Sequence, residues 1–286
     1  MNTEQTIQWF PGHMAKAERK IKEQLGIVDA VAEIIDARIP VSSRNPDLSR
    51  IIANKPKIVI LNKCDMADSR ATAEWINYFN SQGVAAVALD CRSGKGINKF
   101  SETVKKVLAG KLEYYRSKGL AGKPLRVMVV GIPNVGKSTF INRIAGGNRA
   151  KAENRPGVTR GNQWFTIDKE LELLDTPGVL WPKFEDAIVG EHLAFTGAVK
   201  DNVIDTLLLA VKLCEFLRDN YKDLIEQRYK ITTTDKDAYD IFCEIGKKRG
   251  FLIRGGETDE DRTANMLLEE FRNCKLGNIT IEKVND

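Results

Sequence analysis

The residues best suited to phosphate chemistry stand together in the stretch Gly131-Ile132-Pro133-Asn134-Val135-Gly136-Lys137-Ser138. This G-x-x-x-x-G-K-S pattern follows an apolar run and opens a segment with helical spacing, which is the context that a phosphate-binding loop requires. Backbone N–H groups of such a loop surround the phosphates of a nucleotide, and its lysine adds a positive charge. The residues predicted to bind nucleotide here are Asn134, Val135, Gly136, Lys137, Ser138 and Thr139.

Three residues with oxygen-bearing side chains are candidates to hold Mg²⁺ beside those phosphates. The Ser138 hydroxyl is one, and Asp175, which opens Asp175-Thr176-Pro177-Gly178 after an apolar run, is the second. The Gly178 amide is placed to meet the γ-phosphate. Thr159 lies between the two motifs, in a loop expected to close onto the ion when the γ-phosphate is present. The same Asp, Pro and Gly residues also form ordinary turns, and Thr159 could equally be a plain loop residue.

The carboxylate of Asn62-Lys63-Cys64-Asp65 decides which base the chain is expected to bind. Asp65 can accept hydrogen bonds from N1–H and the 2-amino group of guanine, whereas adenine would leave this carboxylate unpaired. Asn62 can bridge the base edge and the phosphate loop, and the stem of Lys63 can cover the ring. The motif is short, but it follows the apolar run Lys57–Leu61 and accompanies a phosphate loop, so it predicts GTP and GDP as ligands.

A second base-reading segment is expected at Asp90-Cys91-Arg92. In many GTPases this loop resembles Ser-Ala-Lys, so the chain departs from the usual pattern here. The Cys91 amide can still donate to guanine O6, whereas the Asp90 side chain is expected to alter base affinity.

Alternating apolar and amphipathic stretches must position these loops. Short runs rich in β-branched residues read as strands at Ala30–Asp36, Lys57–Leu61, Val84–Leu89 and Leu125–Val130. Helical spacing between them predicts an α/β fold with a mostly parallel sheet and helices on both faces. Trp164–Ile167 and Leu171–Leu174 read as a hairpin, and Gly110–Lys123 as a polar connection. Residues 1–189 are predicted to form this domain and residues 190–286 a small helical one, with Thr258 as an N-cap.

Composition is that of an ordinary globular protein, with 42% hydrophobic and 29% charged residues in a chain of 286. Five scattered cysteines, without a C-x-x-C pair, argue against a disulfide framework and a zinc site and favour a reducing compartment. The chain has no signal-peptide pattern and no apolar stretch long enough to span a membrane, so the cytoplasm is the expected location. A net charge of +5, with the basic excess in residues 1–189, suits a polyanionic partner or is simply solvated.

The order of the motifs is reversed relative to an ordinary Ras-like domain, because Asn62–Asp65 precedes the phosphate loop. Together with Trp9-Phe10-Pro11-Gly12-His13-Met14, Asp36-Ala37-Arg38-Ile39-Pro40 and Leu180-Trp181-Pro182-Lys183-Phe184, this order makes the chain resemble the circularly permuted GTPases of the YlqF/RbgA family of bacterial ribosome biogenesis factors. The resemblance implies a permuted P-loop domain followed by a helical RNA-contacting domain. It also implies late maturation of the large (50S) ribosomal subunit, with GTP hydrolysis stimulated by the particle. The expected partner is the subunit precursor, its rRNA and proteins, without membrane or DNA.

The hydrolytic machinery is less evident from the sequence. Val179 stands where Ras-like enzymes carry a glutamine that orients the attacking water. His13, in a turn that the resemblance marks as catalytic, can orient or polarise water, or it can be a structural histidine. Asn134 is a candidate to help ligate K⁺, a cation that would stabilise the charge of the transition state. The alternative is a nucleotide-gated RNA-binding or scaffold module with negligible turnover.

Basic residues form two clusters that could contact RNA phosphates. One surrounds the expected switch loop and the other lies in a loop of the helical domain. Their members are Arg143, Arg149, Lys151, Arg155 and Arg160 in the first, and Lys247, Lys248, Arg249 and Arg254 in the second. Charge clusters of this kind are often simply solvated. Without an aromatic RNA-binding motif, we expect recognition of RNA shape rather than sequence.

Overall fold

The computed structural model describes residues 11–284 except for 53, 121, 147–162, 180–185 and 200–204, and it describes side chains from residue 16 onward. The chain divides into two compact units. The first contains the residues up to Glu185 together with the segment that begins at Thr280, and the second is Asp186–Ile279. The units therefore part slightly before the predicted division after residue 189, which would have cut a helix, and the last residues return to the first unit.

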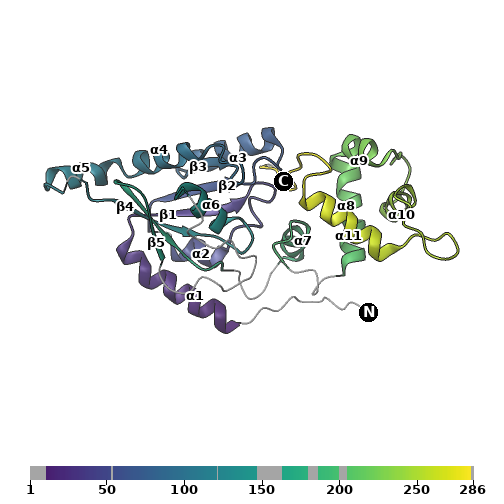
Figure 1. Ribbon diagram of the computed structural model, residues 1–286, viewed down its shortest axis with the longest axis horizontal. Helices are drawn as coiled ribbons and strands as arrows, with labels where there is room; N and C mark the ends of the chain where they lie inside the picture. Colours follow the sequence, from purple (N-terminus) through teal and green to yellow (C-terminus); the bar gives the residue numbers. More distant parts are fainter. Residues whose placement is uncertain are drawn as a thin grey trace. The chain divides into compact units, whose positions relative to one another are not determined.

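A six-stranded sheet forms the centre of the first unit (Figure 1). Its spatial order is β3-β2-β1-β4-β6-β5, and every pairing is parallel except that of β5 with β6. The strands are β1 (Ala30–Asp36), β2 (Lys57–Asn62), β3 (Ala85–Leu89), β4 (Leu125–Val130), β5 (Gln163–Asp168) and β6 (Leu171–Asp175). The parallel sheet and the hairpin confirm the predicted fold class.

Register brings the predicted functional segments to one edge of this sheet. Asp36 pairs with Asn62, and Asn62 in turn pairs with Leu89, so the ends of β1, β2 and β3 are aligned. On the other side of β1, Val129 of β4 pairs with Asp175 at the end of β6. Ligands of open parallel sheets bind outside the carboxyl ends of the strands, where the strand order reverses, and here that point lies between β1 and β4.

Helices cover both faces of the sheet. Ile21 and Leu48 pack from two helices against Val31 and Met128 on one face, and Trp75 and Phe79 extend this layer over β2. On the other face, the buried rings of Phe100 and Phe140 meet edge to face, 5.0 Å apart. The helices of this unit are α1 (Pro11–Gln24), the short η1 (Leu25–Ile27), α2 (Pro46–Ile51), α3 (Ser69–Ser81), α4 (Ile97–Val107), α5 (Ala109–Ser117) and α6 (Lys137–Ile144).

Two of these helices correct the sequence interpretation. The stretch Gly110–Lys123 overlaps α5, because Tyr115 is buried and anchors one side of a segment that otherwise reads as polar. Pro11-Gly12-His13-Met14 forms the first turn of α1 rather than a free turn, with a proline at its first position, where the missing N–H is harmless.

The regular elements in the described residues of the second unit are helices, with one isolated antiparallel bridge between Leu252 and Thr258. The helices are α7 (Ala187–Phe195), α8 (Thr206–Asn220), α9 (Lys222–Tyr229), α10 (Ala238–Lys248) and α11 (Glu260–Arg272). Leu213, Phe242 and Leu267 are fully buried between α8, α10 and α11. Asp259, and not Thr258 as predicted, caps α11 by accepting from the Arg262 amide, since the carboxylate is the stronger acceptor. Across the described part of the chain, the helices are all too short or too polar to cross a bilayer.

Candidate nucleotide site

The phosphate loop lies between β4 and α6, and its backbone adopts the conformations that its residue types permit. Gly131, Asn134 and Gly136 have φ values of 151°, 63° and 97°, and Asn134 is an exposed residue in the left-handed region. A Cβ atom on Gly136 would lie 2.3 Å from Nδ2 of Asn62, so only glycine allows this approach. The loop therefore curls over the end of the sheet and touches the base-reading motif.

Lys137 is buried inside this loop. Its Nζ donates to the carbonyl oxygens of Gly131, at 3.0 Å, and Ile132, at 2.7 Å. Burial lowers the pKa of Lys137 to about 8, although nearby Asp175 acts in the opposite direction. An ammonium group that donates to neutral carbonyls in a buried position is disposed to pair with an incoming phosphate.

Asp175-Thr176-Pro177-Gly178 lies against the same loop. Burial raises the pKa of Asp175 to about 6, an effect that Lys137 opposes. The Thr176 hydroxyl donates to Val129 O at 2.7 Å, and this bond fixes the chain as it leaves β6. A Cβ on Gly178 would come within 2.9 Å of Lys137 Nζ, so this glycine lies next to the cation. The two predicted phosphate motifs, which are far apart in sequence, thus lie against each other.

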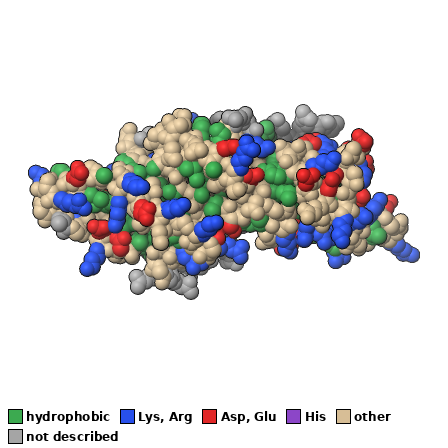
Figure 2. All heavy atoms as spheres, turned by 90° about the horizontal axis from the view of Figure 1, so that it is seen from above, with side chains coloured by type: hydrophobic (Ala, Val, Ile, Leu, Met, Phe, Trp, Pro, Cys, Tyr) green, Lys and Arg blue, Asp and Glu red, His purple; other side chains and the backbone are tan. Residues whose placement is uncertain are grey.

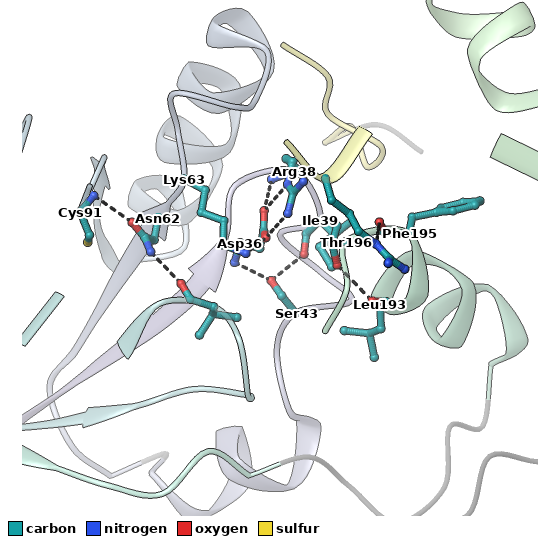
Figure 3. A network of polar contacts seen from close by, with 12 residues as sticks. Asp36, Arg38, Ile39, Ser43, Asn62, Lys63, Cys91, Leu193, Phe195 and Thr196 are labelled. Carbon is teal, nitrogen blue, oxygen red and sulfur yellow. Dashed lines mark hydrogen bonds and ion pairs between the residues drawn. The ribbon is translucent and has the colours of Figure 1, made fainter. Parts of the chain in front are cut away.

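Asn62 joins the base half of the site to the phosphate half. Its Nδ2 donates to Val135 O at 2.7 Å, and its Oδ1 accepts from the Cys91 amide at 3.3 Å (Figure 3). This bridge connects three loops that follow β2, β3 and β4. The Cys91 amide, predicted to donate to guanine O6, is thus engaged with Asn62 through a long bond for which a base oxygen can compete.

Lys63 occupies the left-handed region, with φ of 60°, and its ammonium lies 2.9 Å from Oδ2 of Asp36. Burial lowers the pKa of Lys63, and Asp36 opposes that effect. Asp65, two residues later, carries an exposed carboxylate, and its pKa is raised by partial burial and by the neighbouring charge of Asp90. The lysine is therefore tied to the sheet while Asp65 remains accessible to a ligand.

The unusual loop Asp90-Cys91-Arg92 is held by its own side chain. Asp90 Oδ1 accepts from the amides of Arg92, at 2.8 Å, and Ser93, at 3.2 Å. These bonds keep the pKa of Asp90 low even though burial acts in the other direction, and burial raises the pKa of the Cys91 thiol to about 12. Asp90 thus takes part in the turn rather than extending toward the base position.

Arg143 holds the same loop from α6. Its guanidinium donates from Nε to Cys91 O at 3.3 Å, and from Nη2 to Arg92 O. Sequence reasoning had placed Arg143 with the RNA-contacting cluster, whereas in the structure it links the phosphate-loop helix to the second base-reading loop. The other members of that cluster, 149, 151, 155 and 160, lie outside the described residues.

Mg²⁺ would find a suitable donor set between the phosphate motifs. Ser138 lies in the first turn of α6 and Asp175 at the end of the neighbouring strand, and a hydroxyl and a carboxylate are the hard oxygen ligands that Mg²⁺ uses beside substrate phosphates. Within the described residues, the His, Cys, Asp and Glu side chains form no cluster of three that could hold a metal without such a substrate. Thr159 lies outside the described residues, as does the side chain of His13 in α1.

Sequence reasoning missed three participants in this site. Asp36 and Arg38 belong to the motif Asp36–Pro40, which carries the family resemblance but does not by itself predict a role for either residue. Arg143 carried only a generic charge signal. For the two members of the motif the signal was present, since charged residues at the end of a buried strand and directly after it point to the functional edge of the sheet.

Comparison with known proteins agrees with this geometry. A family model described as "50S ribosome-binding GTPase" matches residues 126–248. The chain is 50% identical to ribosome biogenesis GTPase A of Priestia megaterium, over 97% of this chain and 96% of that protein. It is 32% identical to the protein of the same name from Thermotoga maritima, over 98% and 95%. The solved GNP-bound YlqF from T. maritima superposes with a TM-score of 0.65 at 27% identity, covering 95% of this chain and 99% of that one.

Proposed function

Because this chain belongs to the ribosome biogenesis GTPase A family, a group of GTP-binding ribosome assembly factors, we propose that it acts in late maturation of the large (50S) ribosomal subunit. In this proposal, the precursor particle, with its rRNA and proteins, stimulates GTP hydrolysis to GDP and phosphate. The observation that carries the assignment of the site is the Asn62 bridge, which connects the base-reading loops to the phosphate loop at one edge of the sheet.

Each part of the site has a proposed task toward GTP. Asp65 accepts hydrogen bonds from the guanine edge, Lys63 covers the ring, and the Cys91 amide meets the base oxygen. Lys137 and the loop amides hold the β- and γ-phosphates, while the Gly178 amide senses the γ-phosphate. Ser138 and Asp175, with Thr159, would hold Mg²⁺, which supplies positive charge next to these phosphates when it is bound.

The environment of Val179 supports dependence on an external stimulus. Its side chain is buried in the cluster of α1, α2 and the sheet, its amide donates to Gly131 O at 3.3 Å, and its carbonyl accepts from Asn45 Nδ2 at 3.1 Å. A residue fixed in this way cannot orient water. We therefore propose that His13 positions the attacking water, and that K⁺ held by Asn134 balances the developing charge.

A basic surface of the helical unit suits an RNA partner. Lys247, Lys248 and Arg254 are exposed around the loop that follows α10, and Lys and Arg side chains gather on the face of this unit seen in Figure 2. Arg249 differs from them, because it packs over the Tyr229 ring and reaches Glu270. The first three residues are thus the better candidates for phosphate contacts.

Turnover of GTP with isolated ribosomal subunits tests this proposal. We expect large subunits to raise the rate well above that of the protein alone, small subunits to leave it unchanged, and K⁺ to support more turnover than Na⁺. His13→Ala should lose the stimulated rate while it retains GTP binding, and Lys137→Ala serves as the non-binding control. Equal rates with and without large subunits would favour the alternative, a nucleotide-gated RNA-binding module with negligible turnover.

A further inference from the structure

The end of the chain returns to the nucleotide unit and lies beside the loops that follow β1 and β2. The Ile281 amide donates to Arg38 O at 2.8 Å, and the Thr280 hydroxyl accepts from the Asp68 amide at 3.0 Å. Trp75 of α3 donates from Nε1 to Glu282 O at 2.9 Å. These bonds attach the last segment directly to both loops at the base-reading edge of the sheet.

Glu282 contributes a buried carboxylate to this attachment. The side chain is 8% exposed, and its Oε2 accepts from the Val41 amide at 2.5 Å. Oε1 accepts from the Ser42 amide at 3.0 Å and also from the Ser42 hydroxyl. A carboxylate bound by two backbone amides and a hydroxyl fixes the loop that contains Val41 and Ser42 more firmly than a neutral acceptor would.

The same loop holds Asp36, the carboxylate that pairs with Lys63. Arg38 donates from Nε to Asp36 Oδ1 at 3.0 Å and from Nη2 to Oδ2 at 2.8 Å, and Ser43 Oγ accepts from the Asp36 amide at 3.0 Å (Figure 3). Asp36 Oδ2 then pairs with Lys63 Nζ at 2.9 Å. Asp36 and Arg38 are each 2% exposed, so this arrangement tolerates little displacement.

Charge and backbone conformation make the base-reading loop sensitive to that arrangement. Arg38 and Lys63 contribute two positive charges next to the single carboxylate of Asp36, and Glu282 places a second carboxylate on the loop that follows them. Lys63 also holds a left-handed backbone conformation, which persists only where the surroundings impose it. Loss of the contacts at residues 38–42 would relax both the salt bridge and this conformation.

We infer that Glu282 is a positioning residue for guanine binding, and that the C-terminal segment is a working part of the base-reading half of the nucleotide site. Glu282 acts through the loop that carries Asp36 and Arg38, and thereby through Lys63. The inference rests on the proposed role of Asn62–Asp65 in reading guanine. It gives a function to a segment that lies far from these residues in sequence.

Measured affinities of the full chain for GDP and IDP test this role, because IDP lacks the 2-amino group that Asp65 would read. We expect Glu282→Ala to weaken GDP binding about tenfold and to narrow the preference for GDP over IDP, because a fixed loop is what discriminates the two bases. The KM for GTP should rise while kcat at saturation stays close to that of the wild type. Glu282→Gln keeps the length and one acceptor oxygen, but its NH2 group would face a backbone N–H, so it should recover only part of the affinity. Glu113→Gln, on the exposed surface of α5, is the matched control.

A purely structural role would lower the melting temperature and leave the preference for GDP over IDP unchanged, which would overturn the inference. If Glu282→Ala fails to fold, Ser42→Ala removes one hydrogen bond to the same carboxylate without leaving a charge unpaired. An unchanged preference for GDP over IDP in Ser42→Ala would equally contradict the inference. Asp65→Asn distinguishes a failure of the proposed base site from a failure of the role proposed for Glu282. If that variant keeps the guanine preference, the proposed base site is wrong; if it loses the preference while Glu282→Ala matches the wild type, only the present inference fails.

Discussion

Buried charges occur in both units, but they are arranged in opposite ways. In the helical unit, Glu270 of α11 receives Arg228 at 2.7 Å, the Tyr229 hydroxyl at 2.9 Å and Arg249 at 3.4 Å. Its pKa is lowered by these partners although burial acts against them. In the phosphate half of the nucleotide unit, burial instead raises the pKa of Asp175 to about 6 and lowers that of Lys137 to about 8.

The difference separates charges that hold a fold from charges that are prepared for a ligand. The Glu270 network satisfies its carboxylate internally, so it stabilises the packing of three helices. Asp175 and Lys137 are each held where their charged forms are disfavoured, which is the condition in which phosphate and Mg²⁺ bring the largest gain. Asp36 resembles Glu270 in this respect, because its carboxylate is paired with Arg38 and Lys63 of the same unit.

The largest expected effect is the loss of nucleotide affinity when the buried Lys137 is removed. Lys137→Ala should reduce GTP and GDP affinity by roughly a thousandfold, since charge-assisted hydrogen bonds contribute about 1.5–3 kcal/mol each. Isothermal titration measures this loss. Stability without nucleotide should stay equal or rise, because a buried cation has been removed. The exposed Lys118→Ala variant is the control, and an affinity loss of equal size in both variants would erase the proposed contrast.

Removing the Glu270 carboxylate should lower the stability of the helical unit without changing nucleotide binding. Glu270→Gln is expected to lower the free energy of unfolding of the helical unit by about 2–4 kcal/mol at pH 7, because it leaves Arg228 and Arg249 without their carboxylate. Denaturant unfolding measures this change, and GDP affinity should be unaltered.

The pH dependence of that difference has a definite sign. The folded-state pKa of Glu270 lies below its ordinary value of 4.5, so its contribution is complete above pH 4.5 and disappears as pH falls through the folded-state pKa. Wild type and Glu270→Gln should therefore converge in stability at low pH. A gap that stays constant from neutral to strongly acid pH would show that the carboxylate charge is not the cause.

Arg143→Ala should have an intermediate effect on the ligand. The variant frees the carbonyls of Cys91 and Arg92, so GDP affinity is expected to fall roughly fivefold, the equivalent of about 1 kcal/mol, through loss of order in one loop. Fluorescence titration with a labelled GDP measures it, with the exposed Arg116→Ala variant as the control. An unchanged affinity would mean that the loop is held sufficiently by Asp90.

The smallest expected effect on stability comes from breaking an exposed ion pair. Arg70 and Glu74 form a pair at 3.1 Å on the surface of α3, with side chains 89% and 46% exposed. Arg70→Ala should change the free energy of unfolding by no more than about 0.5 kcal/mol. A thermal melt measures this change. If Arg70→Ala lowered the free energy of unfolding as much as Glu270→Gln, burial would not explain why the two ion pairs contribute differently to stability.

Local pattern was sufficient to predict the sheet and the loops that lie at the carboxyl ends of its strands. Ala30–Asp36 and Leu125–Val130 have the predicted bounds, because each is a short, mostly apolar run bounded by turn or polar residues. Asn62 contacts the loop at Val135, as predicted from its position at the end of an apolar run, and it is the last residue of β2. These features depend on strand periodicity and on the alignment of parallel strand ends, both of which can be read from sequence.

Contacts between residues that are far apart in sequence could not be predicted from local pattern. The segment from Thr280 looks like a polar tail, and its contacts with residues 38–68 join positions that are 212 to 243 residues apart, which local periodicity does not encode. Arg143 reads as surface charge until α6 is placed beside the loop after β3. The helix α5 was missed because a single buried tyrosine supplies its only strong signal.

Base preference tests the central claim most directly, since both the proposed function and the role of Glu282 depend on it. The affinities of the wild type and Asp65→Asn for GDP and XDP should be measured side by side. Xanthine carries a carbonyl where guanine has its amino group, so an asparagine amide can donate to it and still accept from N1–H. We predict that the wild type prefers GDP and that Asp65→Asn prefers XDP. An unchanged preference for GDP in the variant would contradict the account.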